Sequence, residues 1–476
     1  MTRGVAGTAT YLPRARLTAE TIESAWGTNG GRGIEMKAVA AADEDAVTMA
    51  IAATDRLLES VSIDREAIEF VGFATTTPPV EEEDQVPRIA RALGLAPTVR
   101  TTSSTQSTGG FGDVLLTALD ADGPALVVAA DAPEGEPAGT DHAFGAGAAA
   151  FLIDDPADAS VLDSATHVLD RPGVRYRRRG ESTVETLSIS RYERDAVAAS
   201  TVGAVERLPV DDARLVAAAL PQPDGATPGR LGSALDLEYG VVEAGTVVDS
   251  IGDAGAATTA IGLAIALEAA EYEDQTLAAL YGSGGGVRAV LLAGGVDTVA
   301  TADLDGGVEL TYTQYLRQRG YVVDGDVAGG GANVSLPTWQ RTLDQRYRLV
   351  AGRCPTCGEL TFPPEGACSG CRDRVDYEPV TLPRVATVRA YTRIDQGGAP
   401  PEFNEYQERT GAFGNAIVEH VVDDTSVTIP GQITDADPDA VSLGDTVRSV
   451  VRRLYVQEGV VRYGVKYVPH HDATAD

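Results

Sequence analysis

The sequence predicts an α/β domain followed by a smaller, mostly β-stranded C-terminal region. Through residues 1–300, short runs rich in β-branched residues alternate with alanine-rich helical stretches, which is the pattern of an α/β domain. After residue 380 the pattern changes to short strands separated by turn signals, as at 435–438 and 458–459. The 476 residues are enough for two or three such domains.

The α/β part is predicted element by element from its hydrophobic pattern. In the helix at 254–270, Ala257, Ile261 and Ile265 recur at every fourth position and form one buried stripe. The order helix, strand, strand at 108–153 recurs at 254–292, which predicts a pseudo-symmetric layered fold. The predicted strands are 4–11, 70–74, 125–130, 148–153, 246–250, 277–281 and 288–292, and the other predicted helices are 45–60, 85–93, 108–119 and 230–237.

The C-terminal region is predicted to contain a connector, a cysteine-rich segment, a barrel and a tail. Residues 301–350 form the connector, with helices at 312–319 and 336–347 and a glycine-rich linker at 325–333. Residues 470–476 form a disordered tail. Five strands within 381–469 predict a small barrel of the OB type, at 386–394, 414–421, 427–433, 446–455 and 460–468.

The charge of the chain is strongly acidic. Lys and Arg total 38 against 70 Asp and Glu, a net charge of −32, and lysine occurs only at Lys37 and Lys466. The acidic residues are spread along the chain, which is typical of a halophilic surface. No basic footprint for nucleic acid is present, and no run of about 18 apolar residues predicts a membrane helix. Without a secretory signal pattern, we expect a cytoplasmic protein.

The four cysteines form two C-x-x-C pairs, Cys354 with Cys357 and Cys368 with Cys371. Each pair makes a tight knuckle that directs two thiolates at one centre, and two knuckles complete a tetrahedral site. The spacing therefore predicts a zinc ribbon at 351–380. Because four protein ligands leave no open position for water, the zinc is expected to be structural. The alternative is four free thiols in a loop.

The residues around the cysteines resemble a known family. Arg353 before the first cysteine, Phe-Pro-Pro at 362–364 and the strand at 388–392 are similar to the acyl-CoA-associated zinc-ribbon/OB-fold proteins. The resemblance covers residues 336–468. In archaea such proteins are partners of thiolase and HMG-CoA synthase. The resemblance implies acyl-CoA as ligand or substrate and a thiolase or other condensing enzyme as partner.

Residues 1–300 resemble HMG-CoA synthase and, more distantly, ketoacyl-ACP synthase III, both members of the thiolase superfamily. The resemblance implies a thiolase-like layered αβαβα fold for this domain and a homodimer. Residues 310–320 are similar to the C-terminal end of the archaeal forms. The other matching segments are 7–13, 43–50, 127–131, 146–151 and 281–284.

The catalytic residues that this resemblance would imply are replaced. These enzymes use a cysteine at a helix N-terminus, where the helix dipole favours thiolate, but residues 1–353 contain no cysteine. Gln106 stands at the matching position. Pro221 replaces the histidine of the family's His-Gln-Pro-Asn-Gly motif, and Asp253 stands where the family has asparagine. These three are degenerate positions.

The acid and base positions are also changed. The family's general-acid glutamate should fall near 74–76, where none is present, and Glu81–Glu83 lies downstream. The histidines that precede the cysteines, His142 and His167, stand at positions that do not match the family's. Neither a thiolate nor a suitably placed imidazole is therefore expected in this domain.

The sequence predicts a non-catalytic thiolase-fold protein, fused to a zinc-ribbon/OB module, that binds acyl-CoA or docks a condensing enzyme. The alternative is an HMG-CoA synthase-like or ketoacyl-synthase-like acyltransferase with an atypical site, using Gln106 or a serine among Ser103, Ser104 and Ser107. Glutamine at this position also occurs in decarboxylating ketosynthase-like domains, so decarboxylation stays open. Isoprenoid-precursor synthesis is the pathway that the resemblance suggests.

Overall fold

The computed structural model describes residues 3–137, 139–297, 299–322, 334–395 and 401–470. The chain divides into two compact units, Met1–Leu316 and Arg317–Asp476. The predicted linker at 325–333 and residues 471–476 of the predicted tail lie outside the described residues. In the part that the structure covers, no helix is long and apolar enough to cross a membrane.

The first unit is built around one mixed β-sheet, whose described strands run in the order β5-β4-β6-β7-β1-β8-β11-β10-β9, with β12 beside β1. A smaller sheet joins β13, β2 and β3. The strands are β1 Gly4–Tyr11, β2 Ala15–Thr18, β3 Met36–Val39, β4 Phe70–Ala74, β5 Arg100–Ser104, β6 Ala125–Asp131, β7 Gly147–Asp154, β8 Ala159–Arg171, β9 Leu215–Ala219, β10 Gln275–Gly282, β11 Gly284–Ala293, β12 Val299–Ala300 and β13 Val308–Glu309.

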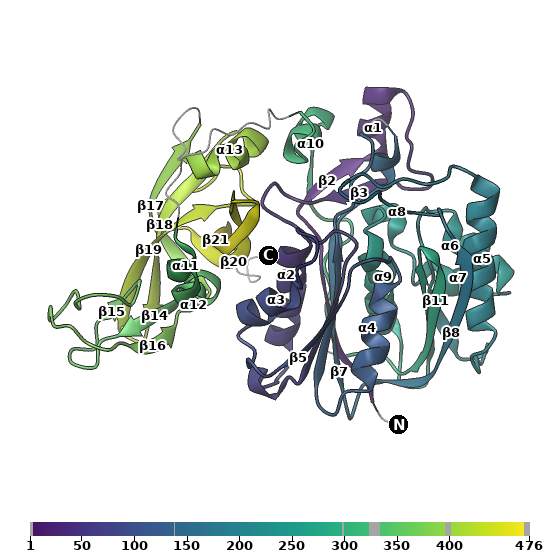
Figure 1. The fold of residues 1–476 in the computed structure, drawn as a ribbon, viewed down its shortest axis with the longest axis horizontal. Coiled ribbons are helices and arrows are strands. Elements are labelled where there is room, and N and C mark those ends of the chain that lie inside the picture. Colours follow the sequence, from purple (N-terminus) through teal and green to yellow (C-terminus); the bar gives the residue numbers. More distant parts are fainter. Residues whose placement is uncertain (1–2, 138, 298, 323–333, 396–400, 471–476) are drawn as a thin grey trace. The chain divides into compact units, whose positions relative to one another are not determined.

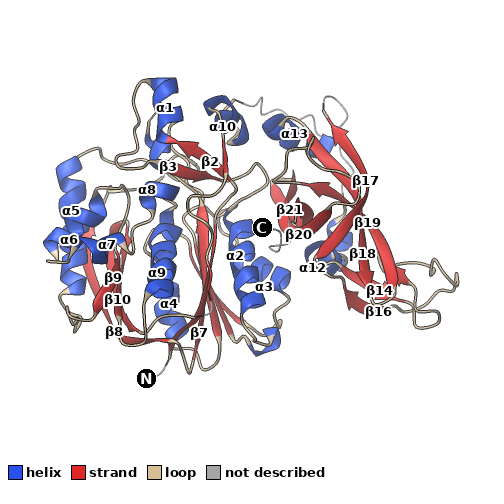
Figure 2. Cartoon of the chain, turned by 180° about the vertical axis from the view of Figure 1, so that it is seen from behind, coloured by secondary structure: helices blue, strands red, loops and turns tan. Residues whose placement is uncertain are grey.

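Helices pack on the outer faces of this sheet and in the layer between its two halves. The helices are α1 Ala19–Trp26, α2 Ala46–Ser60, α3 Val86–Leu93, α4 Gly110–Leu119, α5 Ser190–Val205, α6 Thr227–Ala234, α7 Tyr239–Glu243, α8 Val248–Ile251, α9 Thr258–Ala269 and α10 Tyr312–Gln318. Helices α4 and α9 lie between the two halves of the sheet, and each contacts strands of both halves (Figure 1). Figure 2 shows α2 and α3 outside one half and α5, α6 and α7 outside the other. The result is a five-layered αβαβα arrangement.

The predicted duplication is visible in the sheet. In one half α4 precedes the antiparallel pair β6–β7, and β6 runs parallel to β4. In the other half α9 precedes the antiparallel pair β10–β11, and β10 runs parallel to β9. The central helices are almost wholly apolar, and the Phe111 ring of α4 packs 4.9 Å from the Phe151 ring of β7. Burial of nearly all of α9 explains why its sequence lacks a polar face.

Local sequence signals set several helix starts. Asp45 caps α2, and its side chain accepts a hydrogen bond from the Thr48 backbone N–H while the Thr48 hydroxyl accepts one from the Asp45 N–H. Thr18 caps α1 through the Thr21 N–H. Such caps, of which that of α2 is reciprocal, satisfy N–H groups that have no partner inside the helix. The helix predicted at 45–60 is therefore confirmed to within a residue.

The predicted strand at 246–250 is wrong, because this segment leads into the short helix α8. The side-chain oxygen of Gln222 accepts hydrogen bonds from the backbone N–H groups of Val247 and Val248. These N–H groups are thereby satisfied by a side chain rather than by a neighbouring strand. The sequence pattern indicates a strand here because residues 246–248 are all β-branched.

The second unit combines helices, a small sheet and a closed barrel. Its elements are α11 Leu336–Arg341, α12 Leu343–Arg348, β14 Val350–Arg353, β15 Leu360–Thr361, β16 Glu378–Thr381, β17 Val385–Ile394, α13 Asn404–Thr410, β18 Phe413–Val422, β19 Thr425–Ile433, β20 Thr446–Gln457 and β21 Val460–Pro469. Strands β15, β14 and β16 form the small sheet, and β17-β18-β19-β21-β20 close the barrel. All five barrel strands predicted from the sequence are present.

Both lysines are buried. Lys37 on β3 is 1% exposed, and its ammonium contacts the Asp141 carboxylate at 3.3 Å and the Tyr315 hydroxyl at 2.9 Å. Lys466 on β21 is wholly buried, with its ammonium 3.7 Å from the centre of the Tyr406 ring. Each charge is offset by an aromatic face, and that of Lys37 also by a carboxylate.

Candidate functional site

The four cysteines converge in the second unit. Their sulfur atoms all lie within 4.8 Å of one another, with Sγ–Sγ distances of 3.7 Å between Cys354 and Cys371 and 3.6 Å between Cys357 and Cys368. Four sulfurs bound tetrahedrally to zinc at about 2.3 Å stand about 3.8 Å apart. The sulfur set therefore fits a structural four-thiolate zinc site.

Backbone hydrogen bonds shape each cysteine knuckle. The Gly358 N–H donates to the Cys354 carbonyl at 2.9 Å, and the Arg372 N–H donates to the Cys368 carbonyl at 2.9 Å. Gly358 has a φ of 79°, a left-handed conformation that glycine adopts without strain. The two cysteine pairs lie in the loops that connect the strands of the sheet β15-β14-β16.

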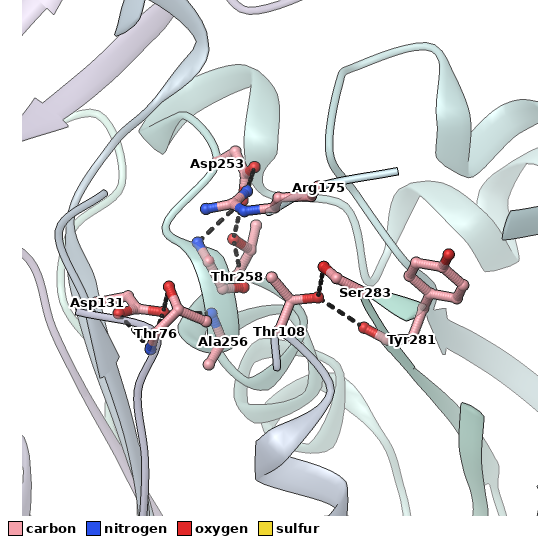
Figure 3. Close-up of polar contacts among 10 residues, drawn as sticks. Thr76, Thr108, Asp131, Arg175, Asp253, Ala256, Thr258, Tyr281 and Ser283 are labelled. Carbon is pink, nitrogen blue, oxygen red and sulfur yellow. Dashed lines mark hydrogen bonds and ion pairs between the residues drawn. The ribbon is translucent and has the colours of Figure 1, made fainter. Parts of the chain in front are cut away.

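In the first unit, the start of α4 faces the turn between β10 and β11. A Cβ atom placed on Gly282 would lie 2.3 Å from the Ser107 hydroxyl oxygen, so Ser107 fills the space that a glycine leaves. That oxygen accepts a hydrogen bond from the Gly109 N–H at 3.2 Å. The Thr108 hydroxyl donates to the Tyr281 carbonyl at 2.9 Å (Figure 3). Gln106 is exposed one residue earlier.

Asp253 lies buried just before α9, where it pairs with an arginine. Its carboxylate accepts hydrogen bonds from Arg175, from the Gly255 N–H at 2.9 Å and from the Thr258 hydroxyl at 3.3 Å (Figure 3). The Arg175 guanidinium also lies 4.9 Å from the centre of the Phe144 ring. The Asp253 carboxylate therefore has one ion-pair partner and two local hydrogen-bond donors, as expected of a carboxylate with a structural role.

Threonines fill the place where the family's general acid was expected. Asp131, at the end of β6, accepts hydrogen bonds from the hydroxyls of Thr75 at 2.8 Å, Thr76 at 2.9 Å and Thr77 at 2.6 Å. It also accepts from the Ala256 N–H at 2.7 Å (Figure 3). Asp131 is fully buried, and these hydroxyl donors compensate the loss of water. The side chain of Arg177 donates to the Thr76 carbonyl.

The segment around Pro221 is occupied by packing and capping contacts. Pro221 is buried. The next residue, Gln222, donates to the Gly245 carbonyl at 2.7 Å. Asp224 accepts hydrogen bonds from the Ala226 and Thr227 N–H groups at 2.9 and 2.7 Å, just before α6. The segment supplies no proton-transferring side chain at Pro221.

The histidines of the first unit have other neighbours. The His142 ring nitrogen lies 3.2 Å from the Tyr312 hydroxyl, and burial lowers the pKa of His142, as does the charge of Lys37. His167 on β8 packs against Gly203 of α5. A Cβ atom added to Gly203 would lie 2.6 Å from the His167 ring. The structure therefore gathers Ser107, Asp131 and Asp253 around the ends of α4 and α9, and gives the histidines structural neighbours elsewhere.

Sequence reasoning missed Arg175 and Arg177, which both reach this region from the segment after β8. Arg175 is 78 positions from its partner Asp253, and Arg177 is 101 positions from Thr76. Their one signal is the run of arginines at 175 and 177–179 in a chain otherwise dominated by acids. Only Arg175 and Arg177 of this run reach the candidate site, since Arg178 and Arg179 pair with acidic residues at the surface.

The layered fold of the first unit is that of the HMG-CoA synthases. A crystal structure of HMG-CoA synthase complexed with CoA superposes with a TM-score of 0.59 at 19% identity, covering 70% of this chain and 94% of that one. The structure of MvaS in complex with 3-hydroxy-3-methylglutaryl coenzyme A superposes with a TM-score of 0.56 at 16% identity, covering 70% of this chain and 94% of that one. The hydroxymethylglutaryl-CoA synthase of Methanopyrus kandleri is 27% identical over 346 residues, which are 68% of this chain and 96% of that protein.

The second unit has different relatives. The family described as the ChsH2 rubredoxin-like zinc ribbon domain matches residues 341–378. A DUF35 domain-containing scaffold protein of Methanocaldococcus jannaschii is 32% identical over 131 residues, which are 27% of this chain and 86% of that protein. The chain belongs to the family of DUF35 domain-containing proteins, and it joins this domain to an HMG-CoA synthase-like thiolase fold.

Proposed function

We propose that the chain is a non-catalytic thiolase-fold protein that binds acyl-CoA and acts as a scaffold for a cysteine-bearing condensing enzyme. One observation carries the proposal: the first unit contains no thiol, and its buried carboxylates at the candidate site are already paired. Acyl-enzyme formation by this superfamily needs a thiolate with a neighbouring acid or base. The relatives named for CoA and for scaffolding support the ligand and the role.

The proposed zinc is structural, and the proposed compartment is the cytoplasm. Four thiolates around one metal leave no coordination position for substrate, so the metal's part is to hold the ribbon together. Paired thiolates stay available to zinc only in a reducing compartment. No step of acyl chemistry is assigned to the metal.

The proposed assembly includes a homodimer as well as the enzyme partner. Strand β5 ends the described order of the large sheet, and all five of its residues are exposed or half-buried. An edge strand of this kind offers unpaired N–H and C=O groups to a second copy. Light scattering of the purified chain at several concentrations tests the dimer, and a monomer at all of them would reject it.

The test of the role combines mass spectrometry with recovery from the native cell. The purified chain is incubated with acetyl-CoA and acetoacetyl-CoA, beside a cysteine-bearing HMG-CoA synthase as positive control. We expect no acyl adduct and no HMG-CoA from this chain, and we expect a cysteine-bearing condensing enzyme to co-purify with it. A stable acyl-enzyme or steady product formation would overturn the proposal.

A second candidate is acyl transfer through Ser107. The observation that favours it is the position of the Ser107 hydroxyl, at the start of α4 and against Gly282. An acyl adduct that disappears in Ser107→Ala and persists in Ser104→Ala would establish it. Absence of an adduct in the unaltered chain leaves the scaffold role as the proposal.

A further inference from the structure

The four cysteines of the ribbon differ in their exposure to water. Cys354 and Cys368, the first cysteine of each pair, are 1% exposed. Each of them donates its backbone N–H to the carbonyl five positions further along, at 2.9 Å, which turns its side chain inward. Cys371 is half-buried, and Cys357 is exposed. Cys357 is therefore the cysteine of the site that faces solvent.

The surroundings of Cys357 leave its sulfur open to a small reagent. Pro355 and Thr356, which precede it, are themselves exposed. Gly370 of the second knuckle lies beside the sulfur, and a Cβ atom added to Gly370 would lie 3.3 Å from it. Gly370 has a negative φ, so its backbone conformation does not require glycine. The missing side chain at this position therefore leaves room next to the sulfur.

A second sulfur lies within reach of Cys357. The Cys357 sulfur is 3.6 Å from that of Cys368, and all four sulfurs lie within 4.8 Å of one another. Cysteines that bind zinc are deprotonated, and the thiolate is the form that reacts with oxidants. The ribbon thus combines one exposed thiolate with neighbours close enough to form a disulfide after a small movement.

We propose that Cys357 is an oxidation site for hydrogen peroxide, through which the ribbon exchanges its zinc for a disulfide. The Cys357 thiolate attacks one peroxide oxygen, so the S–O bond forms, the O–O bond breaks and hydroxide leaves. A neighbouring thiolate then displaces hydroxide from the sulfenic acid, forming the S–S bond as the S–O bond breaks. The two sulfurs together lose two electrons, and the peroxide ends as two hydroxide ions. Two thiolates remain, which is too few to hold zinc.

Oxidation at this exposed position reaches the barrel through a shared core. Ala351 of β14 and Leu360 of β15, the strands on either side of the first knuckle, belong to one buried cluster with Val388 and Val418 of the barrel. Because bound zinc contributes to the folding of such ribbons, its release should lower the stability of the second unit. The inference rests on the proposed structural zinc and is independent of acyl-CoA binding and of the scaffold role.

The experiment treats the zinc-loaded full chain with hydrogen peroxide and follows zinc release with a chromophoric chelator. The matched variants are Cys357→His and Cys354→His, since each removes one sulfur and keeps a side chain that binds zinc. Both are compared at one bound zinc per chain. We expect release to be slower by about tenfold or more in Cys357→His than in Cys354→His, because the buried sulfur is shielded. Equal rates in the two variants would overturn the proposal.

Peptide mapping of the unaltered chain provides a measurement that depends on no variant. Dimedone added with the peroxide should label Cys357 first, and without dimedone the first disulfide should contain Cys357. Gly370→Ala, which adds a methyl group beside the sulfur, should slow the labelling, and Ser369→Ala at an exposed position should not. A first label or a first disulfide that excludes Cys357 would contradict the assignment.

Reversal separates this exchange from oxidative damage. Dithiothreitol and zinc should restore the metal content and the unfolding temperature of the second unit, because a disulfide is reducible and a sulfonic acid is not. Irreversible loss of zinc would reject the exchange. If the purified chain carries zinc that peroxide does not release, the proposed zinc stands and this inference fails. If it carries no zinc, the proposed zinc itself fails.

Discussion

The carboxylate of Asp253 and the guanidinium of Arg175 form an ion pair in which both side chains are largely buried. From the sequence, Asp253 is expected to match an asparagine of the related condensing enzymes. A carboxylate at this position would repel the carbanion that such chemistry develops, and its arginine partner converts the position into a structural contact. This ion pair therefore supports the proposed non-catalytic role of the first unit.

Arg175→Met is expected to lower the free energy of unfolding of the first unit by about 3 kcal/mol, because it leaves the buried Asp253 charge unpaired. Arg175→Met with Asp253→Asn should recover most of this loss. Urea unfolding measures the free energy in a Trp339→Phe background, where Trp26 is the remaining tryptophan and reports on the first unit. Arg178→Met, at an exposed pair with Glu185, is the control and should cost less than about 1 kcal/mol. Equal losses in both variants would contradict the structural role.

Metal analysis should find one zinc per chain and none in Cys368→Ser. Because zinc binding contributes directly to folding of such ribbons, the variant should unfold the second unit at lower denaturant concentration. A Trp26→Phe background leaves Trp339 as the reporter of that unit. Ser369→Ala, at an exposed neighbouring position, should retain the metal. Metal-free protein with unchanged stability would remove the case for a zinc site.

Gly109→Ala should destabilise the contact between α4 and β10. A Cβ atom at this position would lie 2.6 Å from the Gly282 backbone nitrogen, and the backbone cannot move aside as a side chain can. Overpacking of this kind costs about 1–3 kcal/mol. Gly229→Ala in α6 is the matched control, since nothing lies within 4 Å of its added Cβ. There alanine should stabilise the helix by up to about 1 kcal/mol. The measurement is thermal unfolding of both variants.

The second unit should lose stability as the pH falls below about 6.5, the ordinary pKa of histidine. Burial lowers the pKa of His420, whose ring nitrogens lie 2.8 Å from the Pro383 carbonyl and 2.9 Å from the Tyr467 hydroxyl. The unfolded chain then binds a proton at a higher pH than the folded one, so acidification favours unfolding. His420→Gln should flatten this slope and His470→Gln should not. The check is denaturant unfolding at several pH values, and identical slopes would contradict the assignment.

The parts of the fold that the sequence predicts are those governed by local patterns. The barrel strands alternate inward and outward residues, α2 begins at its own cap, and the cysteine spacing alone predicts the ribbon. Strand β8 escaped prediction because its residues are mostly polar and half-exposed, although it lies inside the sheet between β1 and β11. Its place depends on pairing with distant strands, which periodicity does not report.

The candidate site, too, has features that the sequence predicts and features that it does not. The sequence itself shows that residues 1–353 contain no cysteine, and it predicts that Pro221 and Asp253 replace catalytic residues of the related enzymes. It does not predict the partner of Asp253, because that depends on which distant segment arrives beside it. Ser107 was one of three serines open in the sequence, and the structure brings its hydroxyl against Gly282.

The burial of Lys37 and Lys466 leaves the native surface without a lysine amine. Reagents and enzymes that modify lysine side chains therefore meet no target on the folded protein, and acylation of either residue requires the surrounding unit to open. Each unit carries one such amine, so lysine labelling followed by peptide mapping would record the opening of each unit separately.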